Sequence, residues 1–526
     1  MAEKAKKKTR KIPAAVIDIG AHSARMLVAE VDFYSGNFTP LEELEMPVPL
    51  GSDVFRHARI SDNSIHLLCG ILRNYAEKMK EYGVQRCRAI ATSAVREAEN
   101  AEIFIERIRH ATGIDVSILE GADEARLDYI AVAGGKGGEE EFFRTERTMI
   151  ADIGTGACQI SGYDRGKLLF TETLKAGTLR ALELMPGTVS ATAGRQYLAD
   201  IINKSFAELE HVSSDLGAST LVVLGSSARG LIPLLNSLPG TPEAKERGVT
   251  GLPSYSARTF SLLYQATAHA GTSELCEKYS IPAEMAETVS PCCVILDNLF
   301  HITGAGRMVL PMTSTKYLLL EDFIQQEQGR EQKKQSPFDT QLRALLEGTA
   351  AKYRCLNDVT LRTASFAGLL FRHLESIHGL GERERKILHA SAMLHKCGLF
   401  IDNQGYHKHS YYIIMNTPIP GLSLEERQLT ALTARYHRKS LPKNLHPEFA
   451  SLTGEGRSVV CKLAAILRIS CALALTAASP EDILLKVRRD KVTVSCPDDS
   501  ILLSGFVPAN DIGFFRSVFA CEITFS

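Results

Sequence analysis

Two stretches of the chain read almost alike, AAVIDIGAHS at residues 14–23 and TMIADIGTGA at residues 148–157. Each is an apolar run long enough for one buried strand, and each ends in Asp-Ile-Gly followed by small residues. A glycine after a buried strand lets the backbone turn sharply, so that consecutive N–H groups converge on a concavity that suits a phosphate group. Two such loops facing each other would hold a phosphate chain from both sides. The aspartates at the strand ends, Asp18 and Asp152, can hold a divalent cation directly or through water.

The composition is that of a globular protein with several domains. At 526 residues the chain is too long for a single core, and it is 45% hydrophobic and 23% charged, without tryptophan. Its 60 Lys and Arg balance 61 Asp and Glu, so a polyanion must be held by local clusters of charge, and no specific nucleic-acid binding is expected. The twelve cysteines form no C-x-x-C pair, and no apolar run is long enough to span a bilayer. We therefore expect a cytoplasmic protein without membrane contact.

The first domain is predicted to be an α/β unit whose sheet begins with the strand that carries Asp18. After its last strand, the next helix has Asp123 and Glu124 in the first turn. These acidic residues either cap the helix or, in the case of Glu124, activate a water for attack on phosphorus. The predicted elements are strands at 15–19, 25–31 and 41–46, a helix at 64–80, a strand at 87–91, a helix at 101–111 and a strand at 116–119.

The second half repeats this order after the glycine-rich residues 134–138. We expect strands at 158–163 and 167–174, a long amphipathic helix at 193–209, and a buried strand at 221–224 that ends in a small-residue loop. The repetition predicts a duplicated α/β domain.

The ends of the chain differ from these two halves. The basic tail at residues 1–12 is either a solvated disordered arm or a contact for nucleic acid or polyphosphate. A polar, glutamine-rich segment at 323–336 marks a boundary, and after Pro480 the pattern changes to short strands at 483–487, 491–496 and 520–525. The predicted domains are 1–12, 13–133, 134–322, a helical domain at 323–480 and a small α/β domain at 481–526.

Taken in order, the short motifs of the chain resemble the exopolyphosphatase/guanosine-pentaphosphatase (Ppx/GppA) family. The resemblance implies two duplicated actin-like (ASKHA, ribonuclease H-like) α/β domains with an interdomain cleft, an all-α HD-like domain and a small α/β appendix. The motifs that carry it are the two Asp-Ile-Gly loops, ATSAVR at 91–96, EARL at 124–127, the Gly225 loop, LHKCG at 394–398, GYHKHS at 405–410 and RYHRKS at 435–440.

The resemblance also implies roles for single residues. Glu124 would be the general base that activates the lytic water, Arg96 would bind phosphate, and Asp152 and Asp18 would bind Mg²⁺ or Mn²⁺. The implied reaction releases orthophosphate from the end of inorganic polyphosphate, with guanosine pentaphosphate as another substrate and a homodimer as the assembly. The phosphate-binding residues would be Asp18, Gly20, Ala21, His22, Ser23, Gly154, Thr155, Gly156, Ala157, Gly225 and Ser226.

Both loops depart from the family pattern. The usual first loop, D-x-G-S-N-S, has Ala21 and His22 here, and the usual second loop, D-I-G-G-G-S-x-E, has Thr155, Ala157 and Gln159. Backbone N–H donors survive these changes, so phosphate binding is less affected than turnover. The alternatives are a hydrolase and a catalytically weakened regulatory protein that holds polyphosphate or an alarmone. A sugar or acetate kinase of the same fold is a weaker third alternative.

The predicted helical domain carries histidines and cations. In metal-dependent HD phosphohydrolases adjacent His and Asp bind the metal, but here Lys396 follows His395, and its ammonium cannot share a cation site. We expect His395 to be a core histidine with satisfied hydrogen bonds. A dense cationic set is either a solvated helix face or a basic wall that guides a long polyanion. It comprises Lys408, His409, Arg438 and Lys439, with Arg435 and His437 beside them.

Overall fold

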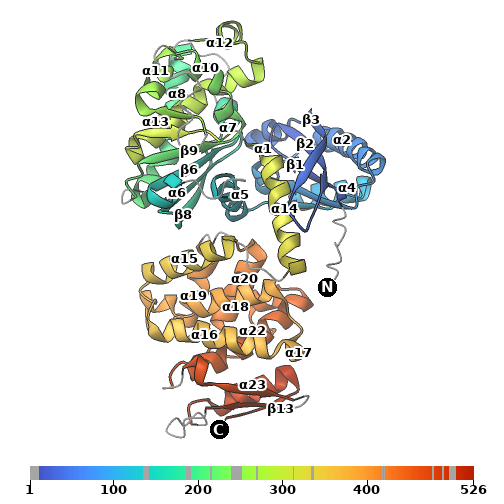
Figure 1. The fold of residues 1–526 in the computed structure, drawn as a ribbon, viewed down its shortest axis with the longest axis vertical. Coiled ribbons are helices and arrows are strands. Elements are labelled where there is room, and N and C mark those ends of the chain that lie inside the picture. The colour runs from blue at the N-terminus through green and yellow to red at the C-terminus, as the bar shows by residue number, and fades with distance from the viewer. Residues whose placement is uncertain are drawn as a thin grey trace, which may run out of the picture. The chain divides into compact units, whose positions relative to one another are not determined.

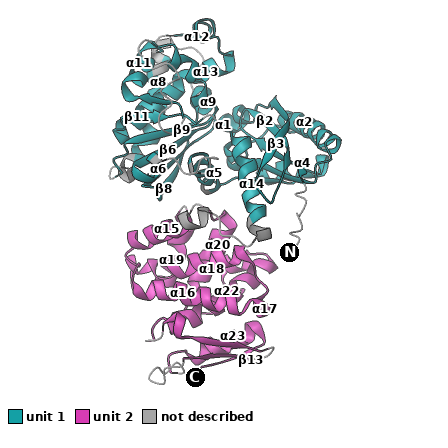
Figure 2. Cartoon of the chain, in the orientation of Figure 1, with its two compact units in different colours: residues 1–340 teal, residues 341–526 magenta. Residues whose placement is uncertain are grey.

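The computed structural model describes most of the chain as two compact units, residues 1–340 and 341–526 (Figure 2). Most of the basic tail (residues 1–10), the glycine-rich residues 134–138 and residues 333–336 of the polar segment lie outside the described residues. The described residues are 11–133, 141–184, 191–213, 216–238, 252–267, 270–311, 313–332, 337–417, 419, 421–476, 479–488, 491–496 and 505–525.

The first lobe of unit 1 contains a five-stranded sheet of order β3-β2-β1-β4-β5 (Figure 1). β1 forms an antiparallel hairpin with β2 and a parallel pair with β4. All five strands lie where the sequence predicts them, within a few residues at each end. Their bounds are β1 (Ile12–Ile19), β2 (Ser23–Val31), β3 (Phe38–Pro47), β4 (Arg86–Ala91) and β5 (Val116–Ile118).

Helices cover this sheet because their apolar residues recur at helical spacing. In α2 the Ser61 side chain accepts a hydrogen bond from the Ser64 N–H at the N-terminus, and Leu68 and Leu72 are fully buried. Tyr75 fixes the helix to the sheet by donating to the Ala24 carbonyl at 2.8 Å. The helices of this lobe are α1 (Leu50–His57), α2 (Asp62–Glu81), α3 (Ser93–Glu97), α4 (Ala101–Thr112) and α5 (Gly121–Ala133).

The second lobe repeats the sheet of the first. Its order is β10-β11-β9-β6-β7-β8, in which β6 pairs antiparallel with β7 and parallel with β9, as β1 does with β2 and β4. The edge strand β10 has no counterpart in the first sheet. The predicted duplication is therefore confirmed in topology. The strands are β6 (Arg147–Ile153), β7 (Cys158–Asp164), β8 (Lys167–Leu174), β9 (Thr220–Leu224), β10 (Ser254–Ser256) and β11 (Arg307–Val309).

The core of the second lobe is built around a long apolar helix, α13, which packs against α8. The predicted helix at 193–209 corresponds to α8, which is longer than expected at both ends. The helices are α6 (Glu141–Thr145), α7 (Thr178–Glu183), α8 (Ala191–Ser213), α9 (Ser226–Arg229), α10 (Ile232–Asn236), α11 (Ala257–Ala266), α12 (Thr272–Tyr279) and α13 (Ala283–Thr303).

The chain then returns to the first lobe in helix α14 (Thr315–Gln332), which packs on β1, β2 and α5 (Figure 1). It buries Leu319, Leu320 and Ile324 in the core that the first sheet shares with α5. The domain boundary predicted between residues 322 and 323 falls inside this helix.

Unit 2 is a group of helices followed by a small sheet. The long helix α22 is buried along most of its length and contacts α16, α18, α20 and α23. The three predicted C-terminal strands are confirmed, in the order β12-β13-β14. The elements are α15 (Pro337–Lys352), α16 (Asp358–His373), α17 (Glu375–His378), α18 (Glu382–Leu394), η1 (Cys397–Phe400), α19 (Tyr406–Asn416), α20 (Leu424–Arg435), α21 (Pro447–Ala450), α22 (Gly454–Leu473), η2 (Pro480–Asp482), β12 (Leu484–Val487), β13 (Lys491–Ser495), α23 (Ala509–Phe519) and β14 (Glu522–Phe525).

Within the described stretches of both units, no helix has the length and apolar character that crossing a bilayer requires.

Candidate functional site

A cavity of about 800 Å³ lies between the two lobes of unit 1, where β1 and β6 end. Glu124 lines it, although Arg96, which was predicted to bind phosphate, does not. The structure thus brings together residues that are more than 200 positions apart in the chain. The cavity-lining residues that the sequence predicted are Asp18, Gly20, Ala21, His22, Ser23, Glu124, Asp152, Gly154, Thr155, Gly156, Ala157, Gly225 and Ser226.

The two Asp-Ile-Gly loops have the same backbone geometry. In each, the N–H of the first residue donates to the carbonyl of the last, at 2.9 Å in Gly20–Ser23 and 3.0 Å in Gly154–Ala157. Unpaired N–H groups that line a cavity are donors for an anion. The middle N–H groups of both loops donate no hydrogen bond to any residue that the structure describes: Ala21, His22, Thr155 and Gly156.

Contacts between the two lobes hold the second loop in place. Arg180 on α7 donates to the Gly156 carbonyl at 2.6 Å and forms an ion pair with Glu97 of the first lobe at 2.5 Å. Its guanidinium also lies over the Phe55 ring, 4.0 Å from the centroid. A Cβ at Gly156 would overlap the Ser93 hydroxyl, so the loop approaches the first lobe closely only because this position is glycine.

A third loop, after β9, also requires glycine. Gly225 has a φ of +101°, and a Cβ there would overlap the Ile153 carbonyl oxygen and lie 2.8 Å from Oδ1 of Asp152. Any side chain at this position would therefore displace Asp152.

Four carboxyl groups line this cavity: Asp18 and Asp128 are buried, and Glu124 and Asp152 are partly exposed. Burial, followed by the charges of Glu124 and Asp18, raises the pKa of Asp152 to about 7. Burial also raises the pKa of Asp18, against the charge of Arg25, and that of Glu124, against Arg96. Asp128, which the sequence did not single out, has its pKa raised well above the usual value by burial and then by Asp152 and Glu124. The site therefore favours neutral carboxyls or a bound cation.

Arg96 lies behind Glu124. One guanidinium nitrogen donates to the Leu119 carbonyl at 2.5 Å and to Glu124 Oε1 at 3.2 Å. Arg96 thus fixes the orientation of the Glu124 carboxylate. The sequence predicted instead that Arg96 contacts phosphate, but Arg96 does not line the cavity.

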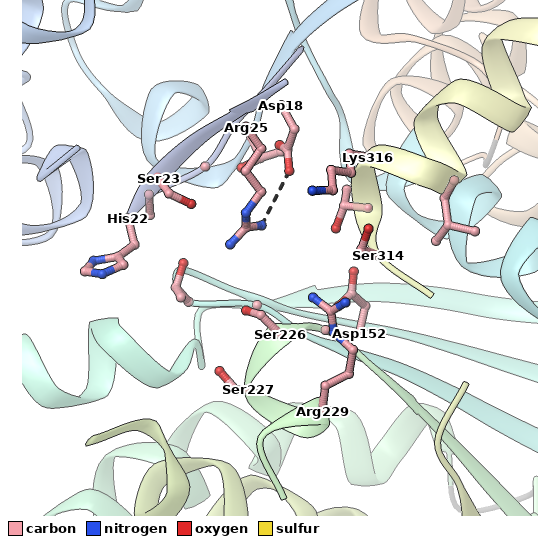
Figure 3. A pocket seen from close by; sticks show the side chains of 18 of the residues that line it. Asp18, His22, Ser23, Arg25, Asp152, Ser226, Ser227, Arg229, Ser314 and Lys316 are labelled. Atoms are coloured by element: carbon pink, nitrogen blue, oxygen red, sulfur yellow. Dashed lines mark ion pairs between the residues drawn. The ribbon is translucent and has the colours of Figure 1, made fainter. Parts of the chain in front are cut away.

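Three cations that the sequence analysis missed line the cavity, Arg25, Arg229 and Lys316. Figure 3 shows Arg25 and Arg229 extending from opposite lobes into the space between them. Arg25 is held by Glu45 at 2.7 Å and Asp18 at 3.7 Å. Arg229 forms no ion pair with any described residue, and burial together with Arg25 lowers its pKa.

Lys316 enters from the first turn of α14, where it pairs with Glu43. An arginine inside an otherwise apolar strand, as in β2, was the available sequence signal for Arg25, whereas nothing local indicates that Lys316 reaches the cavity.

The acidic residues fit a hard divalent cation that has few protein ligands. Oδ1 of Asp18 is buried and has no hydrogen-bond partner, and Asp18 raises the pKa of Asp152, so both carboxylates would gain from a cation nearby. Among the residues that the structure describes, no three carboxylate, imidazole or thiolate side chains are grouped closely enough to hold a metal by themselves. Mg²⁺ commonly binds through one or two carboxylates, with water and substrate phosphates completing its shell.

The basic residues of unit 2 gather around His407. This ring is buried, and its Nδ1 has no hydrogen-bond partner. Burial and then the charges of Lys439, Arg438, Lys408 and Arg435 lower its pKa to about 4. Arg435 is neutralised by Glu448 at 2.9 Å, and the guanidinium of Arg438 lies over the Tyr406 ring, 4.6 Å from its centroid.

Two histidines of the predicted cationic set differ from each other. His409 is partly exposed on α19. His437 is buried, with Nδ1 2.6 Å from the Ala434 carbonyl oxygen and Nε2 3.1 Å from the Tyr406 hydroxyl. Burial lowers the pKa of His437 well below its usual value. The inclusion of His437 among the cations was therefore wrong, since it is a neutral core residue.

His395 was expected to be a core histidine with satisfied hydrogen bonds, and this is correct for only one of its ring nitrogens. Nδ1 lies 2.7 Å from the Ala392 carbonyl oxygen, but the buried Nε2 has no partner. Burial and the charge of Lys396 lower the pKa of His395 to about 4, so this ring is also neutral.

Known proteins resemble this chain over most of its length. It is 23% identical over 465 residues to the guanosine-5'-triphosphate,3'-diphosphate pyrophosphatase of Photobacterium profundum, covering 87% of this chain and 86% of that protein. A protein of the same name from Pseudoalteromonas translucida is 23% identical over 474 residues, which cover 89% and 88% of the two chains. The crystal structure of an exopolyphosphatase from Cytophaga hutchinsonii shares the fold with a TM-score of 0.51 at 18% identity, over 60% of this chain and 97% of that one.

Two family models match separate parts of the chain. Residues 27–296, more than half of the chain, match the Ppx/GppA phosphatase family, and residues 344–501, within unit 2, match Ppx/GppA phosphatase, domain III. The duplicated mixed sheets and the cavity between them agree with these matches. The chain belongs to the Ppx/GppA phosphatase family.

Proposed function

We propose that this chain is a phosphoanhydride hydrolase of the exopolyphosphatase type, which releases orthophosphate from the end of inorganic polyphosphate and also accepts guanosine pentaphosphate. One observation carries the proposal. Glu124, a partly buried carboxylate held by Arg96, shares a cavity with two loops whose N–H groups are free to bind phosphate oxygens. The names of the curated relatives support the nucleotide substrate, and that of the Cytophaga protein supports polyphosphate.

In the proposed reaction the loop N–H groups, Arg25 and Arg229 bind the oxygens of the terminal phosphate. Glu124 accepts a proton from water while the water oxygen bonds to the terminal phosphorus. The bond from this phosphorus to the bridging oxygen breaks, and its electron pair leaves with the shortened chain. Fixed donors and cations in a buried site stabilise the charge on the equatorial oxygens.

Mg²⁺ or Mn²⁺ fits this scheme at Asp152 and Asp18. When bound, such a cation would neutralise charge on the phosphate oxygens. We further propose that the protein is a homodimer and that its helical unit is an HD-like domain without a metal centre, since Lys396 follows His395.

The rival proposal is a regulatory protein that binds polyphosphate or an alarmone without turning it over. Two loop residues favour it. Ala157 lacks the hydroxyl of the family pattern, and Gln159 lacks its carboxylate.

The deciding experiment measures orthophosphate release from long-chain polyphosphate with Mg²⁺ or Mn²⁺, together with equilibrium binding of the same polymer. We expect Glu124→Gln to lower release by about 100- to 10,000-fold, since it removes the general base, while binding is retained. Glu120→Gln is the matched control, because Glu120 precedes α5 and does not line the cavity. Tight binding without release by the wild type would support the regulatory protein, and full activity of Glu124→Gln would contradict the role of Glu124.

A further inference from the structure

Helix α5 brings a second carboxyl group to the cavity. Asp128 follows Glu124 by four residues, so the two side chains lie on the same face of the helix. Asp128 is only 2% exposed and lines the same cavity as Glu124 and Asp152. Its Oδ2 atom is buried and has no hydrogen-bond partner in the part of the chain that the structure describes.

A buried carboxyl without a partner lowers the stability of a fold, so its presence in a cavity calls for an explanation. The charges that act on Asp128 are those of Asp152 and Glu124, which are both acidic. Strand β7 does not supply a hydrogen bond that would offset this burial. Its Tyr163 hydroxyl is also buried and has no hydrogen-bond partner among the described residues, and burial and then the charge of Asp128 raise the pKa of Tyr163. A cation in the cavity is the simplest species that would compensate these three carboxylates.

Strand β7 lacks an acid at the position that faces this cluster. Gln159 pairs with Asp152 across β6 and β7, and it lines the cavity. Both polar atoms of its side-chain amide are hydrogen-bonded, since Nε2 donates to the Thr171 hydroxyl at 2.5 Å and Oε1 accepts from the Thr173 hydroxyl. Gln159 is therefore a structural residue, although the loop pattern described above has an acid at this position.

We propose that Asp128 supplies, from helix α5, the carboxylate beside Asp152 that the loop pattern places on β7 at residue 159. Helix α5 contacts β7 directly, so an acid on either element reaches the same part of the cavity. Asp128 acts through the cation and its water shell, and it is a positioning residue. This inference rests on the divalent cation of the proposed function but not on the identity of the substrate.

The test is direct binding of Mn²⁺ to the full-length protein without substrate, followed by calorimetry and by the electron paramagnetic resonance signal of free Mn²⁺. The pH is set above the pKa of about 7 of Asp152. We expect Asp128→Asn to weaken Mn²⁺ binding by about 10- to 100-fold, the range found for residues that support metal ligands. Adding Gln159→Glu to Asp128→Asn should restore most of the affinity, because the lost charge returns on the neighbouring strand.

Asp123→Asn is the matched control, since Asp123 lies on the same helix, pairs with Arg126 at 3.5 Å and does not line the cavity. Its Mn²⁺ affinity should stay within about twofold of the wild type, because its charge is already paired with Arg126 outside the cavity. Thermal unfolding of each variant verifies that it is folded. Unchanged affinity in Asp128→Asn, no restoration by Gln159→Glu, or no Mn²⁺ binding by the wild type would each overturn the proposal. None of these results depends on polyphosphate hydrolysis, so failure here is distinguishable from failure of the proposed function.

Discussion

Arg96 contacts the proposed general base, and its influence on hydrolysis should pass through the pKa of that group. The charge of Arg96 and its hydrogen bond to Glu124 both lower this pKa, whereas burial raises it. A general base works only while it is ionised. Arg96 therefore keeps Glu124 ionised to a lower pH than burial alone would allow.

We expect Arg96→Gln to move the acidic limb of the profile of kcat/KM against pH to higher pH. Without the guanidinium the pKa of Glu124 rises, so the carboxylate stays protonated, and inactive as a base, over a wider acidic range. A shift of about one pH unit corresponds to about 1.4 kcal/mol of lost interaction. Initial rates of phosphate release across the pH range measure it.

Arg96→Lys is the control, because it keeps the positive charge and should therefore shift the acidic limb of the pH profile less than Arg96→Gln does. A raised KM with an unchanged pH midpoint would instead identify Arg96 as a phosphate ligand.

The sequence indicated the residues of the loops but not the cations around them. The loop residues could be predicted because Asp-Ile-Gly after an apolar run is a local pattern that indicates a strand followed by a tight turn. Arg229 lies in no such pattern, and for Arg25 the only signal is its place in an apolar strand, since the direction of either side chain depends on the packed structure. Asp128 was missed for the same reason, as one more acid on a helix.

At the scale of elements, the predictions were accurate where periodicity decides the structure. The bounds of β1, β2 and α2 were predicted within a few residues, because the spacing of apolar side chains in the sequence determines which residues of these elements are buried. Short elements with little periodicity, such as β10 and β11, were not predicted. Their strand character depends on pairing, of β11 with β9 and of β10 with β11.

Helix α14 shows why composition alone does not locate a domain boundary. Its glutamine-rich end was interpreted as a boundary, but Gln, Glu and Lys are good helix formers, and the helix continues to Gln332. Its anchor is Asp322, a buried acid whose Oδ2 accepts from Arg88 on β4 at 2.5 Å and from Arg126 on α5 at 3.0 Å. These partners are about 200 residues away in sequence, so no local pattern reveals them.

We expect Asp322→Ala to destabilise unit 1 by about 3 kcal/mol, because it leaves the largely buried guanidinium of Arg88 without its acid and removes the nearer of the two carboxylates of Arg126. Activity should fall as well, since α14 also carries Lys316 into the cavity. Urea unfolding followed by circular dichroism measures the loss of stability.

Glu327→Ala is the comparison on the same helix. It removes the 2.7 Å pair with the more exposed Arg86 and should cost about 1 kcal/mol or less. Equal losses from both substitutions would show that Asp322 is not the anchor of α14.

At the scale of the whole molecule, the duplication was predictable, whereas for unit 2 the sequence predicted helices but not how they pack. Two copies of one motif imply two sheets of the same topology whose equivalent loops face each other, and the cavity between the two lobes agrees with this symmetry. Unit 2 carries no repeat. Its basic residues cluster around His407 because α19 and the end of α20 pack together, a contact that the sequence suggested only as a run of charges.

Lys408, Arg438 and Lys439 form no ion pair with any described residue, in contrast to Arg435. Lys439 also has a φ of 54°, and its carbonyl accepts from the buried Arg468 at 3.0 Å. A left-handed backbone at a lysine is uncommon and persists only when its surroundings fix it. The Lys439 backbone and the Arg438 guanidinium are thus fixed, and the charges are not neutralised by ion pairs with described residues, which suits a surface for a polyanion.

We expect Arg438→Gln with Lys439→Gln to raise KM for long-chain polyphosphate by about 10-fold and KM for tripolyphosphate by less than about twofold. The reason is that a guiding role requires a polymer that extends beyond the cavity that binds its end, which tripolyphosphate does not. The difference should shrink as salt is added, because screening weakens exposed charges. Lys486→Gln with Lys491→Gln removes the same charge from β12 and β13 of the same unit, and it should leave both KM values unchanged. Equal effects of the first pair on both substrates would exclude a guiding role for this cluster and leave it as a solvated helix face.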